Sequence, residues 1–281
     1  MRRKISLQCF FGLIVLAFGI SVRAQTPTPT PSLEHEFFKN ILNDQKAIWT
    51  APLRLHGHDA KWAIPAGIGF MALVATDRIT GDEIAESDAP VKMSRAVSHI
   101  GSVYGLGTVA GAFYLLGRAR KDDRARETGL LSAQALVNSI IVESALKGIT
   151  QRGRPTIGKE RSEFFEGGNS FPSGHSTQAW AVAAVVASEY KHRRAVQILA
   201  YGAATAVSVA RFTGQKHYLS DVVVGSALGY TIGKYVYSTH HRQSLDATDD
   251  DGPVSQSWRP MITPQFNRQA HAYGLSLTWS F

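Results

Sequence analysis

Cysteine is almost absent from this chain of 281 residues, because Cys9 is the only one. An internal disulfide framework and a cysteine-rich zinc or iron–sulfur site are therefore excluded. Charged residues make up only 19% of the sequence and no internal repeat is visible, which excludes a coiled coil, a collagen or a disordered chain. Half of the net charge of +8 comes from four basic residues among the first 24, so nucleic acid is not expected as a partner.

The amino terminus has the pattern of a secretory signal peptide. A basic start at residues 2–4 is followed by an apolar stretch over residues 9–20 and by Val22-Arg23-Ala24, which offers small residues at a cleavage site. An uncleaved anchor is the alternative. Residues 25–60 then combine a proline-rich spacer with an amphipathic arm. The predicted organisation is therefore a signal peptide (1–24), this spacer and arm (25–60), a helical domain (61–240) and a linker with a strand-like tail (241–281).

Six apolar stretches rich in small residues occupy the middle of the chain. Each is long enough for a helix rather than a strand, so the sequence predicts an all-α bundle of about six helices. Small residues allow close helix contact in membranes, and the predicted bundle is membrane-embedded, with a soluble periplasmic bundle as the alternative. The stretches are residues 62–76, 100–117, 129–147, 176–190, 195–210 and 221–237.

The remaining segments carry weaker patterns. Residues 246–252 form a charged linker, and alternation from Tyr273 to Phe281 predicts a short strand or hairpin. His56-Gly-His58-Asp59 has no second group of ligands, so a polar loop is favoured over a metal site. His240 and His241 are interpreted as a basic patch at a helix end.

Three polar clusters lie at the ends of the apolar stretches, so a bundle can bring them together at one end. In chain order they are KGITQRGRP (147–155), PSGH (172–175) and RFTGQKHYLSD (211–221). Lys147, Arg154 and Arg211 are cations beside apolar segments, where a charge is costly unless it is paired. A phosphate-like oxyanion pairs with all three at once.

The second and third clusters add groups suited to phosphoryl chemistry. Ser173 is a natural N-cap, Gly174 lets the backbone approach a ligand, and the free N–H groups of that helix start favour an anion. His217 and Asp221 are four residues apart, so Asp221 is placed to hold one ring nitrogen while the other acts as a nucleophile. His175 then serves as the general acid.

The three-part pattern K-x6-RP, PSGH and R-x5-H-x3-D resembles the phosphatidic acid phosphatase type 2 and vanadium haloperoxidase superfamily, in its membrane-associated phosphatase branch. The resemblance implies a phosphohistidine on His217, oriented by Asp221, with His175 protonating the leaving oxygen and no metal or other cofactor. Ala210 departs from the pattern, because a serine usually precedes the arginine. The residues implied to hold the phosphoryl oxygens are Lys147, Arg154, Arg211, Ser173 and Gly174.

The predicted function is an exported phosphatase acting on phosphomonoesters or pyrophosphates, of the lipid phosphate or isoprenoid pyrophosphate kind. The alternatives are a soluble periplasmic acid phosphatase, a vanadate-dependent haloperoxidase and a non-enzymatic envelope protein with a lapsed site. Basic runs at 118–126 and 191–194 lie on the side opposite the motifs. By the positive-inside rule, these runs face the cytoplasm and the site faces the periplasm. The oligomeric state is left open.

Overall fold

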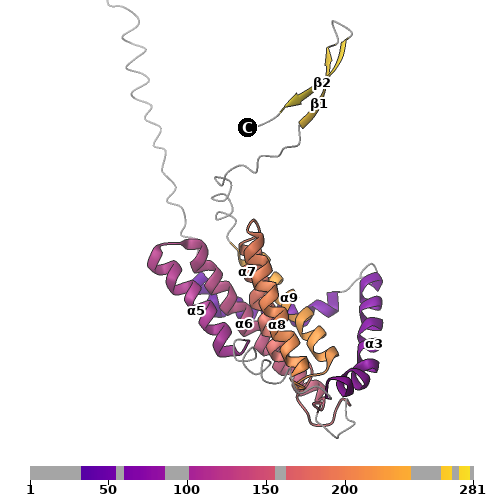
Figure 1. Cartoon of the computed structure of the whole chain (residues 1–281). Helices are drawn as coiled ribbons and strands as arrows, with labels where there is room; N and C mark the ends of the chain where they lie inside the picture. The colour runs from indigo at the N-terminus through magenta and orange to yellow at the C-terminus, as the bar shows by residue number, and fades with distance from the viewer. Residues whose placement is uncertain are drawn as a thin grey trace, which may run out of the picture.

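A computed structural model describes residues 33–54, 60–85, 101–155, 163–241, 261–267 and 272–278. Within these ranges the body of the protein is an all-α bundle, as predicted (Figure 1). Each of the six apolar stretches coincides with one helix, from α3 to α9, and a further helix, α2, precedes them. The helices are α2 (Leu33–Thr50), α3 (Ala60–Ala85), α5 (Val103–Arg120), α6 (Asp123–Thr150), α7 (Gly174–Glu189), α8 (Arg194–Thr213) and α9 (Leu219–His240), with a 3-10 turn at Ala51–Arg54.

Helix α7 is the centre of the bundle, because it contributes to both hydrophobic clusters of the core. Val182 and Val186 pack with residues of α5, α6 and α8, whereas Ala181 and Val185 pack with residues of α6 and α9. Every residue of α7 except His175 and Trp180 is buried. A helix that is apolar all round is expected only where neighbours surround it, which explains its run of alanine and valine.

Helix α9 approaches α7 unusually closely along a stripe of glycines at every fourth position. A Cβ at Gly229 would lie 2.0 Å from the carbonyl oxygen of Thr177, and one at Gly233 would lie 2.2 Å from that of Ala181. The stripe begins at Gly225, opposite the backbone of Ser173. Only residues without a side chain permit this packing, and it places the second sequence motif directly beside the third.

Polar side chains along α6 and α9 hold α2 against the bundle. Asp44 of α2 is fully buried and accepts hydrogen bonds from Gln134 at 2.7 Å and Asn138 at 2.8 Å. His240 contacts the other oxygen of Asp44 at 2.8 Å, and His241 contacts Glu127 at 2.9 Å. The interpretation of these two histidines as a basic patch at a helix end was therefore wrong, because one ring nitrogen of each lies against a buried carboxylate.

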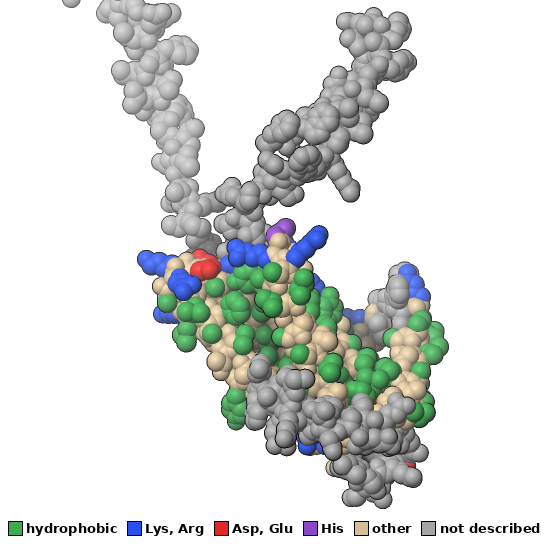
Figure 2. Space-filling model, in the orientation of Figure 1, with side chains coloured by type: hydrophobic (Ala, Val, Ile, Leu, Met, Phe, Trp, Pro, Cys, Tyr) green, Lys and Arg blue, Asp and Glu red, His purple; other side chains and the backbone are tan. Residues whose placement is uncertain are grey.

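The flanks of the bundle expose large apolar side chains, which Figure 2 shows between the two ends. Among the residues that the structure describes, two helices, α6 and α8, are long and apolar enough to cross a membrane by length and composition. Apolar side chains on the surfaces of α3, α5 and α8 include Ile64, Ile68, Met71, Leu115, Leu116, Ile198 and Leu199.

The tail forms a hairpin of two antiparallel strands, β1 (Met261–Asn267) and β2 (Ala272–Thr278), in a register that pairs Met261 with Thr278. The predicted signal peptide, the proline-rich spacer, the loop at residues 56–59 and the linker at 246–252 lie outside the described residues.

Candidate active site

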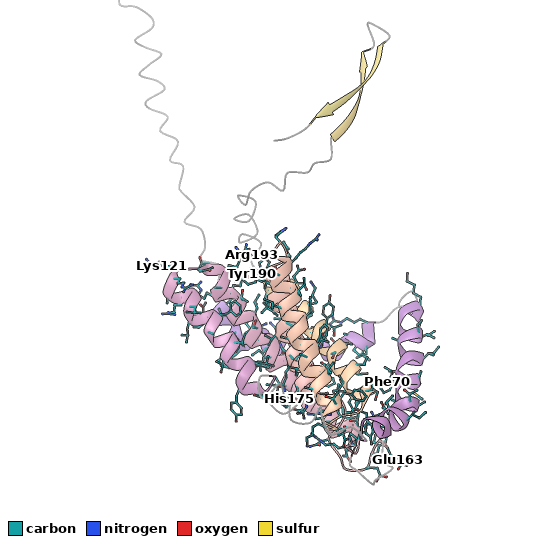
Figure 3. The ribbon with its side chains drawn as sticks, viewed as in Figure 1. Phe70, Lys121, Glu163, His175, Tyr190 and Arg193 are labelled. Atoms are coloured by element: carbon teal, nitrogen blue, oxygen red, sulfur yellow. The ribbon has the colours of Figure 1, made fainter. Side chains whose placement is uncertain are left out.

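The three motifs meet at one end of the bundle. They occupy the carboxyl end of α6, the amino end of α7, and the connection from α8 to α9, which neighbouring helices of alternating direction bring to the same side. Figure 3 shows His175 at this end, whereas Lys121 and Arg193 lie at the opposite end. The positions of the basic runs relative to the motifs therefore match the sequence analysis.

A loop before α7 is paired with the segment that follows α6. Ser170 N–H donates to Arg152 O at 2.9 Å, Gly168 N–H donates to Gln151 O at 2.9 Å, and Thr150 Oγ1 donates to Phe171 O at 3.0 Å. Close approach is required at Gly168, where a Cβ would lie 2.1 Å from the Arg152 carbonyl oxygen. This pairing holds the first and second motifs at a fixed distance.

His217 lies in the connection between α8 and α9 and is almost completely buried, with 2% of its surface exposed. Its Nδ1 is 2.8 Å from the backbone oxygen of Ser170 and 3.7 Å from Oδ2 of Asp221. An Nδ1–H that donates to this carbonyl leaves Nε2 as the nitrogen with a lone pair. Burial lowers the pKa of His217 below its ordinary value, and the neighbouring Asp221 opposes that effect.

Asp221 is the centre of a second set of contacts. Its Oδ2 accepts hydrogen bonds from Ser170 Oγ at 2.5 Å and from Tyr218 N–H at 3.0 Å. Helix α9 begins at Leu219, so His217 precedes the helix and the two residues do not share a helical face. Their proximity arises because Asp221, in the first turn, caps its own helix at Tyr218. Ser170 was not identified from the sequence, because its contact with Asp221 joins two residues that are 51 positions apart in the chain.

Arg152 is completely buried behind Asp221 and was also missed. Its guanidinium donates to Asp221 Oδ1 at 2.6 Å, to Ser220 Oγ at 2.6 Å and to Asp77 Oδ2 at 2.7 Å. The rings of Phe164 and Tyr218 lie 4.7 and 4.5 Å from it. Asp77 comes from α3 and also accepts the backbone N–H of Ser220 at 3.0 Å. Helix α3 is thus connected to the site by a buried ion pair.

His175 lies in the first turn of α7, outside the two candidate membrane spans. Burial, followed by the positive charge of Arg211 and then by His217, Lys147 and Arg154, lowers its pKa to about 4. The positive charges of Lys147, Arg154 and Arg211, the three predicted phosphate-binding cations, all help to lower this pKa, so the three residues lie at the same end of the bundle as His175. We call these three residues the cation cluster.

The members of the cation cluster differ in their present contacts. Lys147 Nζ lies 2.6 Å from Oε2 of Glu143, and Arg154 donates from Nε to Asn169 at 2.8 Å. Arg211 comes from the last turn of α8. A concentration of positive charge of this kind favours an anion with several acceptor oxygens.

Ser173 and Gly174 open α7, as predicted. Ser173 is in the N-cap position and fully buried, but its side chain makes no capping bond and accepts from Ser176 Oγ at 3.1 Å. Its backbone N–H donates to the carbonyl oxygen of Asp221 at 3.0 Å, which joins the second and third motifs. A Cβ at Gly174 would lie 2.5 Å from the Glu143 carboxylate, so the space beside this glycine is filled by a side chain of the protein itself.

The structure is therefore a helical bundle that carries the three cations of the predicted motifs at one end. Residues 128–245 match the model of the PAP2 superfamily.

Over 103 residues the chain is 29% identical to a lipid A 1-phosphatase of Porphyromonas gingivalis. This match covers 36% of the chain and 23% of the relative, so the chain spans about a quarter of that relative's length. Two crystal structures are also similar. A transmembrane PAP2-type phosphatidylglycerolphosphate phosphatase from Bacillus subtilis has a TM-score of 0.47 and 22% identity, over 66% of this chain and 96% of that one. LpxE of Aquifex aeolicus has a TM-score of 0.45 and 18% identity, over 58% of this chain and 93% of that one.

Proposed function

We propose that this protein is a phosphatase that hydrolyses phosphomonoesters or pyrophosphates through a phosphohistidine on His217. The observation that carries the proposal is the engagement of Nδ1 of His217 by the Ser170 carbonyl at 2.8 Å. This contact leaves Nε2 as the attacking atom, in a ring that burial keeps neutral. The cation cluster lies close enough to stabilise the negative charge that develops on the phosphoryl oxygens.

The proposed reaction has two steps. Nε2 of His217 forms a bond to phosphorus while the bond from phosphorus to the leaving oxygen breaks, and that oxygen takes a proton from His175. Water then attacks phosphorus, His175 recovers a proton from this water, and the phosphorus–nitrogen bond breaks to release orthophosphate. Asp221 positions His217 through Ser170 in both steps. The groups that hold the phosphoryl oxygens are the cation cluster, Ser173 and Gly174.

We further propose that the substrate is a phosphorylated lipid, of the lipid phosphate or isoprenoid pyrophosphate class. Exposed apolar side chains on α3, α5 and α8 and the similarity to a lipid A 1-phosphatase support this proposal. In this proposal the protein lies in a membrane after export, with its site facing the periplasm and the basic end around Lys121 and Arg193 facing the cytoplasm. The catalytic domain in this proposal covers residues 61–240.

A substrate panel tests the activity. The full chain, purified in detergent micelles, is incubated with a lipid phosphomonoester, an isoprenoid pyrophosphate and a soluble aryl phosphate, and released orthophosphate is measured. We expect the highest kcat/KM with one of the two lipids. Preference for the aryl phosphate would instead indicate a non-specific acid phosphatase, and halide oxidation by the vanadate-loaded protein would indicate a haloperoxidase.

The variant His217→Ala tests the mechanism. Loss of the nucleophile should lower kcat by about 1,000-fold or more while the helical circular dichroism is retained. His192→Ala is the matched control, because His192 is exposed at the opposite end of the bundle and its variant should keep wild-type activity. Orthovanadate, which mimics five-coordinate phosphorus, should inhibit the wild type. Full activity of His217→Ala would exclude a phosphohistidine at this position.

A further inference from the structure

A carboxylate lies inside the proposed phosphate site, where an acidic group is unexpected. Glu143 is 5% exposed and comes from the last turns of α6, one turn before Lys147. Its Oε2 lies 2.6 Å from Lys147 Nζ, and Gln178 Nε2 of α7 donates to its Oε1 at 3.2 Å. The same carboxylate occupies the space above Gly174, at the amino end of α7. Glu143 therefore contacts both the first and the second motif.

This contact differs from the ion pairs that glutamate and lysine commonly form on helix surfaces. Pairs four residues apart stabilise an exposed helix slightly and have no further role. Here the carboxylate is buried, and Lys147 is one of the cations whose charge acts on His175. A lysine has a long flexible stem and a compact charge, so its ammonium can move from one anion to another without rearrangement of the helix.

We propose that Glu143 is a specificity-determining residue of this site, which competes with the phosphate group for Lys147. The inference rests on the proposed phosphatase function and names a residue outside its three motifs. A phosphate group that enters the site must draw Lys147 away from Glu143. Otherwise both anions contact Lys147, and the phosphate is repelled by the Glu143 carboxylate. Both effects weaken the binding of phosphate anions in the ground state. The product orthophosphate, which keeps its negative charge and has no lipid to hold it, is affected most.

Glu143→Gln is the direct test, because glutamine has the same shape and its amide oxygen still accepts from Gln178. The full chain in detergent is assayed with a soluble aryl phosphate, and inhibition constants are measured for orthophosphate and orthovanadate. We expect the constant for orthophosphate to fall about tenfold, KM to fall with it, and kcat not to rise, because product leaves more slowly. An unchanged or higher inhibition constant would overturn the proposal.

Two further variants separate competition from a general effect of charge. Glu127→Gln is the matched control, because Glu127 is a buried glutamate of the same helix at the opposite end, and its variant should stay within about twofold of wild type. In a Lys147→Met background, Glu143→Gln should change the inhibition constant by less than about twofold, because the contested cation is gone. A full tenfold gain in that background would contradict competition for Lys147.

The design remains informative if a variant folds poorly or if the wild type proves inactive. Glu143→Asp keeps the charge in a shorter side chain and should stay within about threefold of the wild-type constant. A tenfold gain in this variant would also overturn the proposal. Calorimetric titration with orthovanadate needs no turnover. A wild type that binds vanadate and hydrolyses nothing counts against the proposed function alone, whereas equal vanadate affinity in wild type and Glu143→Gln counts against this inference alone.

Discussion

The two ends of the bundle contain the same kinds of side chain in a different balance. At the motif end, the charges of the cation cluster act on the ring of His175, and Lys147 contacts the carboxylate of Glu143. At the opposite end, His241 lies 2.9 Å from Glu127 and 3.3 Å from Glu189, and Arg124 lies 3.8 Å from Glu189. Among the buried groups of the opposite end, carboxylates contact side chains of neighbouring helices, whereas at the motif end three cations of the predicted motifs act on one ring. An excess of positive charge of this kind favours an anion. The comparison therefore contrasts a proposed binding end with an end whose buried contacts join helices.

The largest effect is expected behind the motif end, where the buried guanidinium of Arg152 contacts two buried carboxylates. Asp77→Ala leaves the buried guanidinium of Arg152 with one carboxylate fewer and removes an acceptor from Ser220. The free energy of unfolding should fall by about 3–5 kcal/mol, because one partner of a buried ion pair is lost. Thermal unfolding in detergent, followed by circular dichroism, measures the loss.

Asp77→Asn is the control for this prediction. The amide keeps the shape of the side chain and one acceptor oxygen, so the loss of stability should be smaller than with alanine. Equal thermal stability of Asp77→Ala and wild type would mean that α3 is not held by this contact.

An intermediate effect is expected at the opposite end. His241→Phe keeps the ring that stacks on Tyr237, with centroids 4.5 Å apart, and removes the nitrogens that contact Glu127 and Glu189. The two buried carboxylates lose a partner, so the free energy of unfolding should fall by about 2 kcal/mol. Activity measured below the unfolding temperature should remain at the wild-type value. A change in the KM of His241→Phe would contradict the contrast between the two ends, because it would mean that the end opposite the motifs affects substrate binding.

Most of the helical fold could be predicted from the sequence, because runs of small apolar residues have the length and composition of buried helices. The predicted stretch at 62–76 stopped too early, since α3 continues to Ala85. Asp77 directly follows that stretch, and a charged residue in this position suggests that an apolar helix has ended. Its charge is compensated by Arg152, which lies 75 positions further along the chain. No local pattern contains that information.

The part of the site that lies within the three sequence motifs could be predicted from the sequence. His217, His175 and Asp221 were identified by their spacing, and the roles assigned to them stay predictions. Ser170, Arg152 and Glu143 were not identified, because a serine in a loop, an arginine near another and a glutamate four residues before a lysine are common on surfaces. Their burial, which distinguishes them, follows from the packing of α7 against α6 and α9. Glu143 did carry one signal in the sequence, because it is an acidic residue within an apolar stretch.

The smallest effect concerns the pH dependence of activity, and it follows from the charge excess at the motif end. A general acid must be protonated, so the contribution of His175 is lost as pH rises through its pKa, which is about 4 with the site empty. A bound phosphate anion neutralises the cations that help to lower this pKa, so the pKa of His175 must rise in the complex. The dependence of kcat/KM reports the free enzyme and that of kcat the complex. The basic limb of kcat should therefore lie about one pH unit above that of kcat/KM. A shift of one unit in the pKa of His175 corresponds to about 1.4 kcal/mol.

The acidic limb has the opposite sign. The nucleophile must be neutral, so activity is lost as pH falls through the pKa of His217, which burial holds below its ordinary 6.5. Initial rates with a soluble aryl phosphate from about pH 2.5 to about pH 9, at constant ionic strength, measure both limbs. The separation between the basic limbs should narrow as salt is added, since ions that screen the cation cluster reduce its effect on His175 in the free enzyme. Coincident basic limbs at low salt would mean that these cations do not act on His175 and that the charge excess at this end has no catalytic consequence.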